Sequence, residues 1–212
     1  MRYATLFVLA LTCLHLAACN DAPASEAIGK GEMTDRTYNH EHFGLSITFP
    51  EEWDIMERSQ FEKVMNVGTD ALTDSGVDKR AAEASKNNTI AMFMVTKGGF
   101  SFENGTDCGF NAMTERVKGS GIETGKAYND TIMKMYKDIG MRVTSGSSRD
   151  QTISGVEFSV QPMTFRAPRG KVMVELYSAR IGDYMLVFSS TAGSDQEQAD
   201  VNELIKEIKI EG

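Results

Sequence analysis

Residues 43–53, which read FGLSITFPEEW, constrain the fold more than any other part of this 212-residue chain. Three apolar residues alternate with polar ones, which is the period-two pattern of a half-buried strand: Leu45, Ile47 and Phe49. Pro50 has no amide hydrogen to donate, so we expect the strand to end there. The next two acids, Glu51 and Glu52, are expected in a solvated turn. Trp53, the only tryptophan, is expected to return to the core.

Residues 1–18 are typical of a secretory signal peptide, with Arg2 followed by a short apolar run and small residues. The apolar run is well short of the roughly 20 residues that span a bilayer. The sequence Leu16-Ala17-Ala18-Cys19 resembles the lipobox of bacterial lipoproteins. This resemblance implies that cleavage leaves Cys19 as the first residue, carrying a diacylglycerol and palmitate. An ordinary signal peptide followed by a chance cysteine, or an uncleaved anchor, is the alternative.

The segment after the signal peptide, residues 19–36, is small, polar and acidic, which predicts a flexible tether. Asn20 follows the cysteine where an aspartate would favour the inner membrane. By resemblance to Gram-negative sorting rules, this implies a protein that faces the periplasm from the outer membrane. Asp21, one place later, weakens that inference.

The remaining residues, 37–212, are long enough for one domain with an ordinary core. The chain has a net charge of -8, and loss of Arg2 with the signal peptide would leave -9. This acidic balance argues against nucleic acid as a partner and against electrostatic binding to anionic lipids.

Cysteine usage excludes an internal disulfide in the processed chain. Of the 3 cysteines, Cys13 lies in the signal peptide and Cys19 is the anchor, which leaves Cys108 alone. We expect Cys108 to be a small buried hydrophobic residue, because no histidine or basic neighbour would lower its pKa. A redox site or an intermolecular bridge is the alternative.

Hydrophobic periodicity predicts the order β-β-α-α-β-β-α-β-β-β-β-α-β, beginning at Leu45. Two Ser-x-x-Glu sequences, at Ser59 and Ser194, are capping boxes that predict helix starts. Residues 126–139 predict an amphipathic helix that ends at a capping glycine, Gly140. Residues 111–118 predict an edge-like strand. Gly182, first in a two-residue loop, predicts a type II′ hairpin.

The opening of this domain resembles that of the PsbP-like superfamily, which includes DcrB-type bacterial envelope lipoproteins. The similar residues are Tyr38-Asn39, Phe43-Gly44, the strand over residues 45–50, and Trp53. The resemblance covers roughly residues 37–211 and implies an α-β-α sandwich around a largely antiparallel sheet, which is an α+β fold. Members are mostly non-catalytic binding and assembly factors, and no functional residue is carried over from them.

Two groups of residues are candidate metal ligands. His40 and His42 would share one face of an extended segment, but two ligands do not complete a zinc site, and a solvated loop is the alternative. Met92 and Met94 would share a strand face, and thioethers suit Cu(I). Among the 13 methionines, however, flexible core filling is the ordinary role. We therefore predict no metal site and no cofactor.

No catalytic motif stands out in the sequence. It has no Gly-x-Ser-x-Gly, no phosphate-binding glycine loop and no Cys-x-x-Cys. The sequence therefore favours a lipid-anchored, non-catalytic envelope protein that binds or stabilises a protein partner. Periplasmic copper or zinc handling is the alternative, and an unrecognised hydrolase is a third hypothesis.

Overall fold

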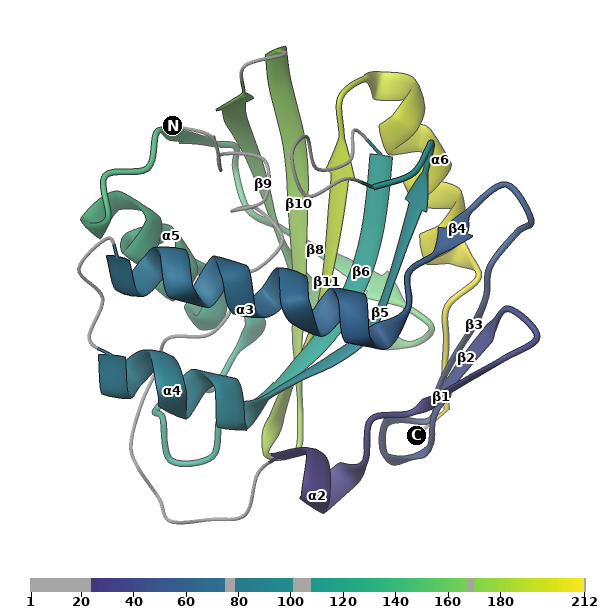
Figure 1. Cartoon of the computed structure of the whole chain (residues 1–212), viewed down its shortest axis with the longest axis horizontal. Helices are drawn as coiled ribbons and strands as arrows, with labels where there is room; N and C mark the ends of the chain where they lie inside the picture. Colours follow the sequence, from purple (N-terminus) through teal and green to yellow (C-terminus); the bar gives the residue numbers. More distant parts are fainter. Residues whose placement is uncertain (1–23, 75–78, 101–107, 168–169, 212) are drawn as a thin grey trace.

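The computed structural model describes residues 24–74, 79–100, 108–167 and 170–211, whose strands form two sheets (Figure 1). All of the strand pairs are antiparallel. The smaller sheet has the order β1-β2-β3-β12, with these bounds: β1 Glu32–Thr34, β2 Thr37–His40, β3 Leu45–Thr48 and β12 Lys209–Ile210. The larger sheet has the order β4-β5-β6-β11-β10-β9-β7, and β8 also pairs with β9. Its bounds are β4 Asp54–Ile55, β5 Thr89–Lys97, β6 Cys108–Arg116, β7 Val143–Ser145, β8 Arg149–Ile153, β9 Val156–Ala167, β10 Gly170–Ile181 and β11 Tyr184–Ala192.

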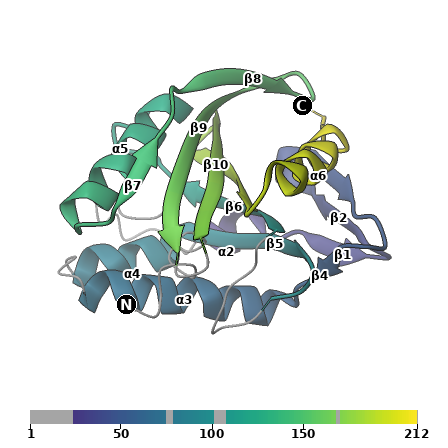
Figure 2. The same ribbon diagram turned by 90° about the horizontal axis from the view of Figure 1, so that it is seen from above.

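Helices cover both faces of the larger sheet (Figure 2). The helices α3 (Arg58–Asp74), α4 (Lys79–Asn88) and α5 (Gly125–Asp138) lie over one face. The helix α6 (Asp195–Lys206) and the smaller sheet lie over the other. Two short elements, α2 (Ala24–Ile28) and the 3-10 helix η1 (Glu41–Phe43), complete the described part. The predicted mixed fold, an antiparallel sheet between layers of helix, is confirmed.

The stretch around Pro50 folds as its pattern predicts. The strand β3 ends at Thr48, and the turn closes when the Trp53 amide donates to the Pro50 carbonyl at 3.1 Å. Glu51 and Glu52 are exposed in this turn, whereas Trp53 is only 2% exposed. The indole ring belongs to the hydrophobic cluster between the two sheets and α6.

A β-bulge in β5 decides which of its side chains face that cluster. The pairing of β5 with β6 shifts register between Ala91 and Phe93. As a result, Met92 and Phe93 both face the smaller sheet and α6, while Met94 faces α3 and α5. A bulge adds one residue to a strand, so the alternation of faces reverses beyond it. The expectation that Met92 and Met94 share a face is therefore wrong.

Several predicted helix ends and turns are confirmed. The amide of Gly140 donates to the Lys137 carbonyl and the amide of Met141 to the Tyr136 carbonyl, which is the Schellman pattern. The hydroxyl of Ser194 accepts from the Glu197 amide at 3.3 Å, as a capping box requires. Gly182 has φ +60 at the first position of its hairpin, which fits type II′.

Other local predictions need correction. The helix α3 begins at Arg58, so Ser59 lies inside the first turn and does not precede it. The strand β6 runs between β5 and β11 and is buried along most of its length, so it is not edge-like. Several polar side chains of this strand are buried and form hydrogen bonds inside the fold. For example, the Thr114 hydroxyl donates to the Met185 carbonyl at 3.0 Å.

Part of the predicted tether is folded against the domain. Within residues 19–36, Ala24 is fully buried at the start of α2, and β1 pairs with β2. The Arg58 guanidinium donates to the Gly31 carbonyl at 2.9 Å, and the Tyr38 hydroxyl donates to the Lys30 carbonyl at 2.8 Å. The prediction of a flexible tether is therefore wrong for residues 24–36, because tertiary hydrogen bonds hold this polar segment against the domain. The signal peptide and Cys19 lie outside the described residues.

We predict that Trp53→Ala lowers the free energy of unfolding by about 3–5 kcal/mol, because the substitution removes a buried aromatic ring and leaves a cavity. Urea unfolding followed by circular dichroism measures this loss. Val67→Ala serves as the control, because Val67 on α3 is 37% exposed and should cost far less. Equal stability of Trp53→Ala and the unsubstituted protein would contradict the packing seen at the turn.

Candidate functional site

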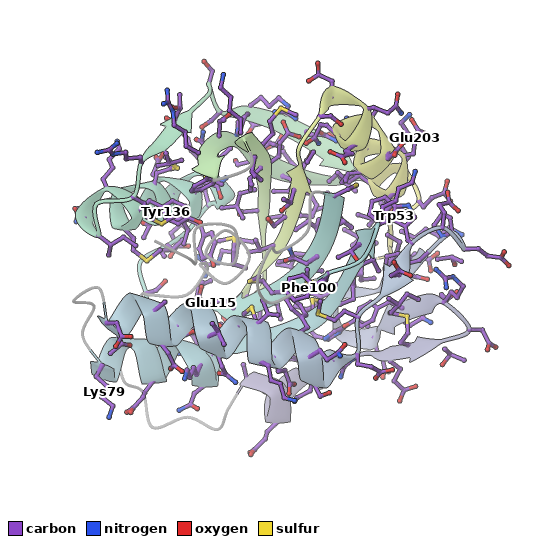
Figure 3. All side chains as sticks on the ribbon, turned by 45° about the horizontal axis from the view of Figure 1, so that its top comes forward. Trp53, Lys79, Phe100, Glu115, Tyr136 and Glu203 are labelled. Atoms are coloured by element: carbon purple, nitrogen blue, oxygen red, sulfur yellow. The ribbon has the colours of Figure 1, made fainter. Side chains whose placement is uncertain are left out.

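A groove of about 420 Å³ lies between the β3–β4 turn, the end of β5 and the last two turns of α6. Its apolar lining is formed by Phe49, Trp53 and Leu204, all of which are buried. Acidic residues from two elements surround that lining: Glu52, Asp200, Glu203 and Glu207. In Figure 3, Trp53 lies next to α6 and Glu203 projects from that helix. The residues of the opening stretch therefore form one wall of a surface site.

An arginine from another part of the chain fixes this wall. Arg36, in the β1–β2 turn, donates from Nε to the Phe49 carbonyl at 3.0 Å. Its Nη2 donates to the carbonyls of Pro50 and Trp53. One guanidinium thus binds three carbonyls of the β3–β4 turn, which are otherwise without strand partners. The wall of the groove is held in place by these charge-assisted bonds.

The groove contains one internal ion pair. The Lys97 Nζ lies 2.7 Å from the Asp200 Oδ2. The hydrogen bond that Lys97 donates to the Asp200 carboxylate raises the pKa of Lys97, and the charge of Glu52 adds to this effect. The same hydrogen bond lowers the pKa of Asp200. Both side chains are therefore charged over the neutral range and neutralise one another.

The other carboxylates leave the groove negative. Glu203 forms an ion pair with Lys206 at 2.6 Å, but both side chains are largely exposed, so this pair is weak. Glu52 and Glu207 form no ion pair among the described residues. Glu207 also caps the C-terminus of α6, where the helix dipole is already negative. Negative charge is thus concentrated where the turn meets the end of the helix.

A smaller pocket of about 230 Å³ lies between α3, α4 and β5. Its charged residues form pairs: Lys30 contacts Glu62 at 2.7 Å, and Lys86 contacts Asp70 at 3.1 Å. This pocket therefore lacks the unbalanced charge of the groove beside α6, and the groove is the stronger candidate for binding.

The two histidines do not form a metal site. His40 ends β2 and is only 1% exposed, so its placement in a solvated loop is wrong. His42 lies in η1, is exposed, and packs edge-on against Tyr184 with ring centroids 5.3 Å apart. The chain turns between the two residues, so they do not share an extended face. Among the described residues, no group of three His, Cys, Asp or Glu side chains could hold a metal ion.

The methionines and the cysteine of the domain serve packing. Met92 and Met94 lie in separate hydrophobic clusters on opposite faces of the larger sheet, as core fillers do. Cys108 is 1% exposed, which confirms its prediction as a buried residue. Burial raises the pKa of its thiol to about 11, so it stays protonated and weakly reactive.

Two carboxylates of the larger sheet, Glu115 and Glu175, form hydrogen bonds inside the fold. Glu115 on β6 accepts from the Tyr128 hydroxyl of α5 at 2.7 Å. Glu175 on β10 lies 2.8 Å from the Arg149 guanidinium of β8 and accepts from the Tyr177 hydroxyl. The Glu115 contact joins β6 to α5 and the Arg149 contact joins β8 to β10, whereas Tyr177 lies on the same strand as Glu175. These hydrogen bonds give both carboxylates a structural role in the fold.

The sequence showed only part of the groove. Glu52 and Trp53 stood out in the opening stretch, but α6 and β5 reach them only through the tertiary fold. Arg36 was missed because it lay in a segment predicted to be flexible. A partial signal existed for α6, whose final turns carry two acids, Glu203 and Glu207, where bases are usually favoured.

Comparison with known proteins identifies the fold. No family model and no curated protein matches the sequence. Among solved structures, the chain is similar to the cyanobacterial PsbP protein CyanoP of Synechocystis sp. PCC 6803, with a TM-score of 0.51 and 9% identity, covering 92% of this chain and 99% of that chain. It is also similar to LpqN of Mycobacterium tuberculosis, a protein involved in cell envelope biogenesis, with a TM-score of 0.46 and 9% identity, covering 92% and 100%.

A third similar structure is the Ran-binding protein Mog1p of Saccharomyces cerevisiae, with a TM-score of 0.39 and 11% identity, covering 84% of this chain and 96% of that chain. The likeness to CyanoP shows that this domain has a PsbP-like fold, as the resemblance of its opening stretch implied. At such low identity, the likeness shows the fold alone.

The buried His40 predicts a specific dependence of stability on pH. Neither of its ring nitrogens has a hydrogen-bond partner among the described residues. Burial, followed by the charges of His42 and Arg58, lowers its pKa to about 4 from an ordinary 6.5. The unfolded chain therefore takes up a proton between pH 6.5 and pH 4 that the folded chain excludes. The free energy of unfolding should fall across this window as pH decreases, by up to about 3 kcal/mol.

Urea unfolding of the protein and of His40→Phe at pH 7 and pH 4.5 measures this contribution. The difference between the two proteins removes the common effect of the carboxylates. His40→Phe should lose less stability on acidification than the unsubstituted protein does. An identical loss in both proteins would show that His40 does not titrate in this way.

Proposed function

We propose that this protein is a lipid-anchored component of a bacterial cell envelope whose PsbP-like domain binds a protein partner without catalysing a reaction. The observation that carries the proposal is the groove beside α6, with its apolar lining, its acidic rim and a wall fixed by Arg36. A surface of this kind suits recognition, because it offers apolar contact and charge on a prearranged backbone.

The proposed anchor is the lipid on Cys19, with the domain facing the periplasm. The signal peptide over residues 1–18 and the lipobox that ends at Cys19 support this proposal. Two or more acyl chains on one residue give stable attachment, whereas one chain gives marginal attachment. Asn20 directly after the cysteine supports the outer membrane as the membrane of residence. Among the described residues, no helix is both long and apolar enough to cross a bilayer.

We predict that Cys19→Ala releases the protein from the membrane fraction and abolishes metabolic labelling with palmitate, because the substitution removes the thiol that would be acylated. Fractionation and labelling of cells producing each variant measure both effects. Cys13→Ala, within the signal peptide, is the matched control and should remain membrane-bound and labelled. Retention of Cys19→Ala on the membrane without label would refute the lipid anchor.

Partner binding is tested by photo-crosslinking in intact cells. A photoreactive amino acid replaces Glu203 at the groove or, as the control, Glu83 on α4, which is exposed on the opposite side of the larger sheet. We expect a reproducible protein adduct from position 203 and none of the same mass from position 83. The absence of any adduct specific to position 203 would contradict a partner at this groove.

A further inference from the structure

The groove beside α6 combines an apolar lining with carboxylates at its rim, and this combination limits what can occupy it. A purely apolar side chain would bury the charges of Glu52 and Glu207 without a partner, which is costly. An acidic segment would be repelled. Lysine and arginine side chains match both parts, because they have an apolar stem and a cationic end.

We propose that this groove binds a lysine or arginine side chain carried by an extended basic segment of a partner protein. The proposal rests on the partner-binding function given above and adds the chemistry of the partner. The stem of the bound side chain would lie against Pro50, the exposed apolar residue of the groove, above the buried Trp53 and Leu204. Its cationic end would lie between Glu52 of the turn and Glu207 of α6.

The fold already contains one example of this recognition. Lys97 enters the groove from the end of β5 and places its ammonium 2.7 Å from the Asp200 carboxylate. This internal lysine uses only Asp200 on α6, one turn before Glu203 and two turns before Glu207. Of the two later carboxylates on the same side of the helix, Glu203 pairs with Lys206, and Glu207 is left for a second cation supplied from outside.

The end of α6 provides an independent reason for a cation at this position. The carbonyls of the last helical turn carry partial negative charge, and Glu207 adds a full charge at the C-cap. Lys206 offsets part of this charge but is itself exposed and paired with Glu203. A bound cation would therefore relieve repulsion that the free protein contains.

The wall opposite α6 needs little rearrangement for binding. The three carbonyls held by Arg36 keep the turn that carries Glu52 in one conformation. A prearranged wall lowers the entropy lost on association. Because the rim carboxylates are exposed, the attraction should still be sensitive to salt.

Calorimetric titration of the full chain, purified in a non-ionic detergent, tests this proposal with three peptides of equal length. One peptide carries alternating lysine and arginine, the second has glutamine at those positions, and the third has glutamate. We expect binding of the basic peptide only, weakened at least tenfold between 50 and 500 mM salt. Trp53, the only tryptophan, should report the same event by fluorescence, because it lines the groove.

Variants assign the binding to the groove. The double substitution Glu52→Lys with Glu207→Lys should weaken binding of the basic peptide by about tenfold or more, a change of about 1.4 kcal/mol. The matched control, Glu26→Lys with Glu83→Lys, makes the same change in net charge on α2 and α4 and should have little effect. Thermal melts of both variants confirm that they are folded, as expected for exposed positions.

Three results would overturn the proposal. They are binding of the glutamine peptide as tightly as the basic one, preferential binding of the glutamate peptide, and equal weakening in both double variants. If the photo-crosslink at position 203 forms but the basic peptide does not bind, the partner function stands and only its chemistry is wrong. If neither occurs, both proposals fail.

Discussion

The packing of the smaller sheet against the larger one depends on an aromatic contact between them. Phe93 of β5 packs edge-on against Phe49 of β3 and Tyr38 of β2, with ring centroids 5.0 and 5.1 Å apart. Phe93 faces these rings because the β-bulge reverses the alternation of β5 at this point. Strict alternation would have placed its ring under α3 and α5. The extra residue of the bulge therefore allows the Phe93 ring to pack the larger sheet against the smaller one.

The groove beside α6 depends on that junction. The smaller sheet carries Arg36 to the β3–β4 turn, and the turn delivers Trp53 beneath α6. The larger sheet brings Lys97 to the same place from the end of β5. Elements that are far apart in the sequence thus build a single wall, and the hydrogen bonds of Arg36 make that wall rigid. A surface site follows directly from how the core is packed.

The distribution of charge separates structural groups from candidate binding groups. On the larger sheet, the buried Glu115 and the half-buried Glu175 accept from hydroxyl or guanidinium donors, because a buried polar group without partners would destabilise the fold. At the groove, Glu52 and Glu207 have no such partners among the described residues and remain in water. The fold therefore accounts for Glu115 and Glu175, while the exposed Glu52 and Glu207 are the groups on which the proposed binding of a basic segment rests. The groove, and not the buried polar network, carries the functional proposal.

The sequence by itself determined the features that depend on local patterns. The alternation of Leu45, Ile47 and Phe49, the stop at Pro50 and the glycine cap at Gly140 all follow from backbone chemistry within a few residues, and the structure confirms them. The antiparallel sheet between helices was also predictable, because apolar periodicity marks which faces are buried. The short polar strands β1, β2 and β8 were not predicted, because they lack apolar alternation, although each pairs with the next strand along the chain.

Only the tertiary structure decided where the chemistry lies. The bulge in β5 separated Met92 from Met94, and the turn after β2 separated a buried His40 from an exposed His42. Long-range packing also placed Glu52 and the end of α6 around one groove, although most of the domain separates them in the sequence. Such juxtapositions depend on pairing register and burial. These are properties of the whole fold, and no periodic pattern in the sequence indicates them.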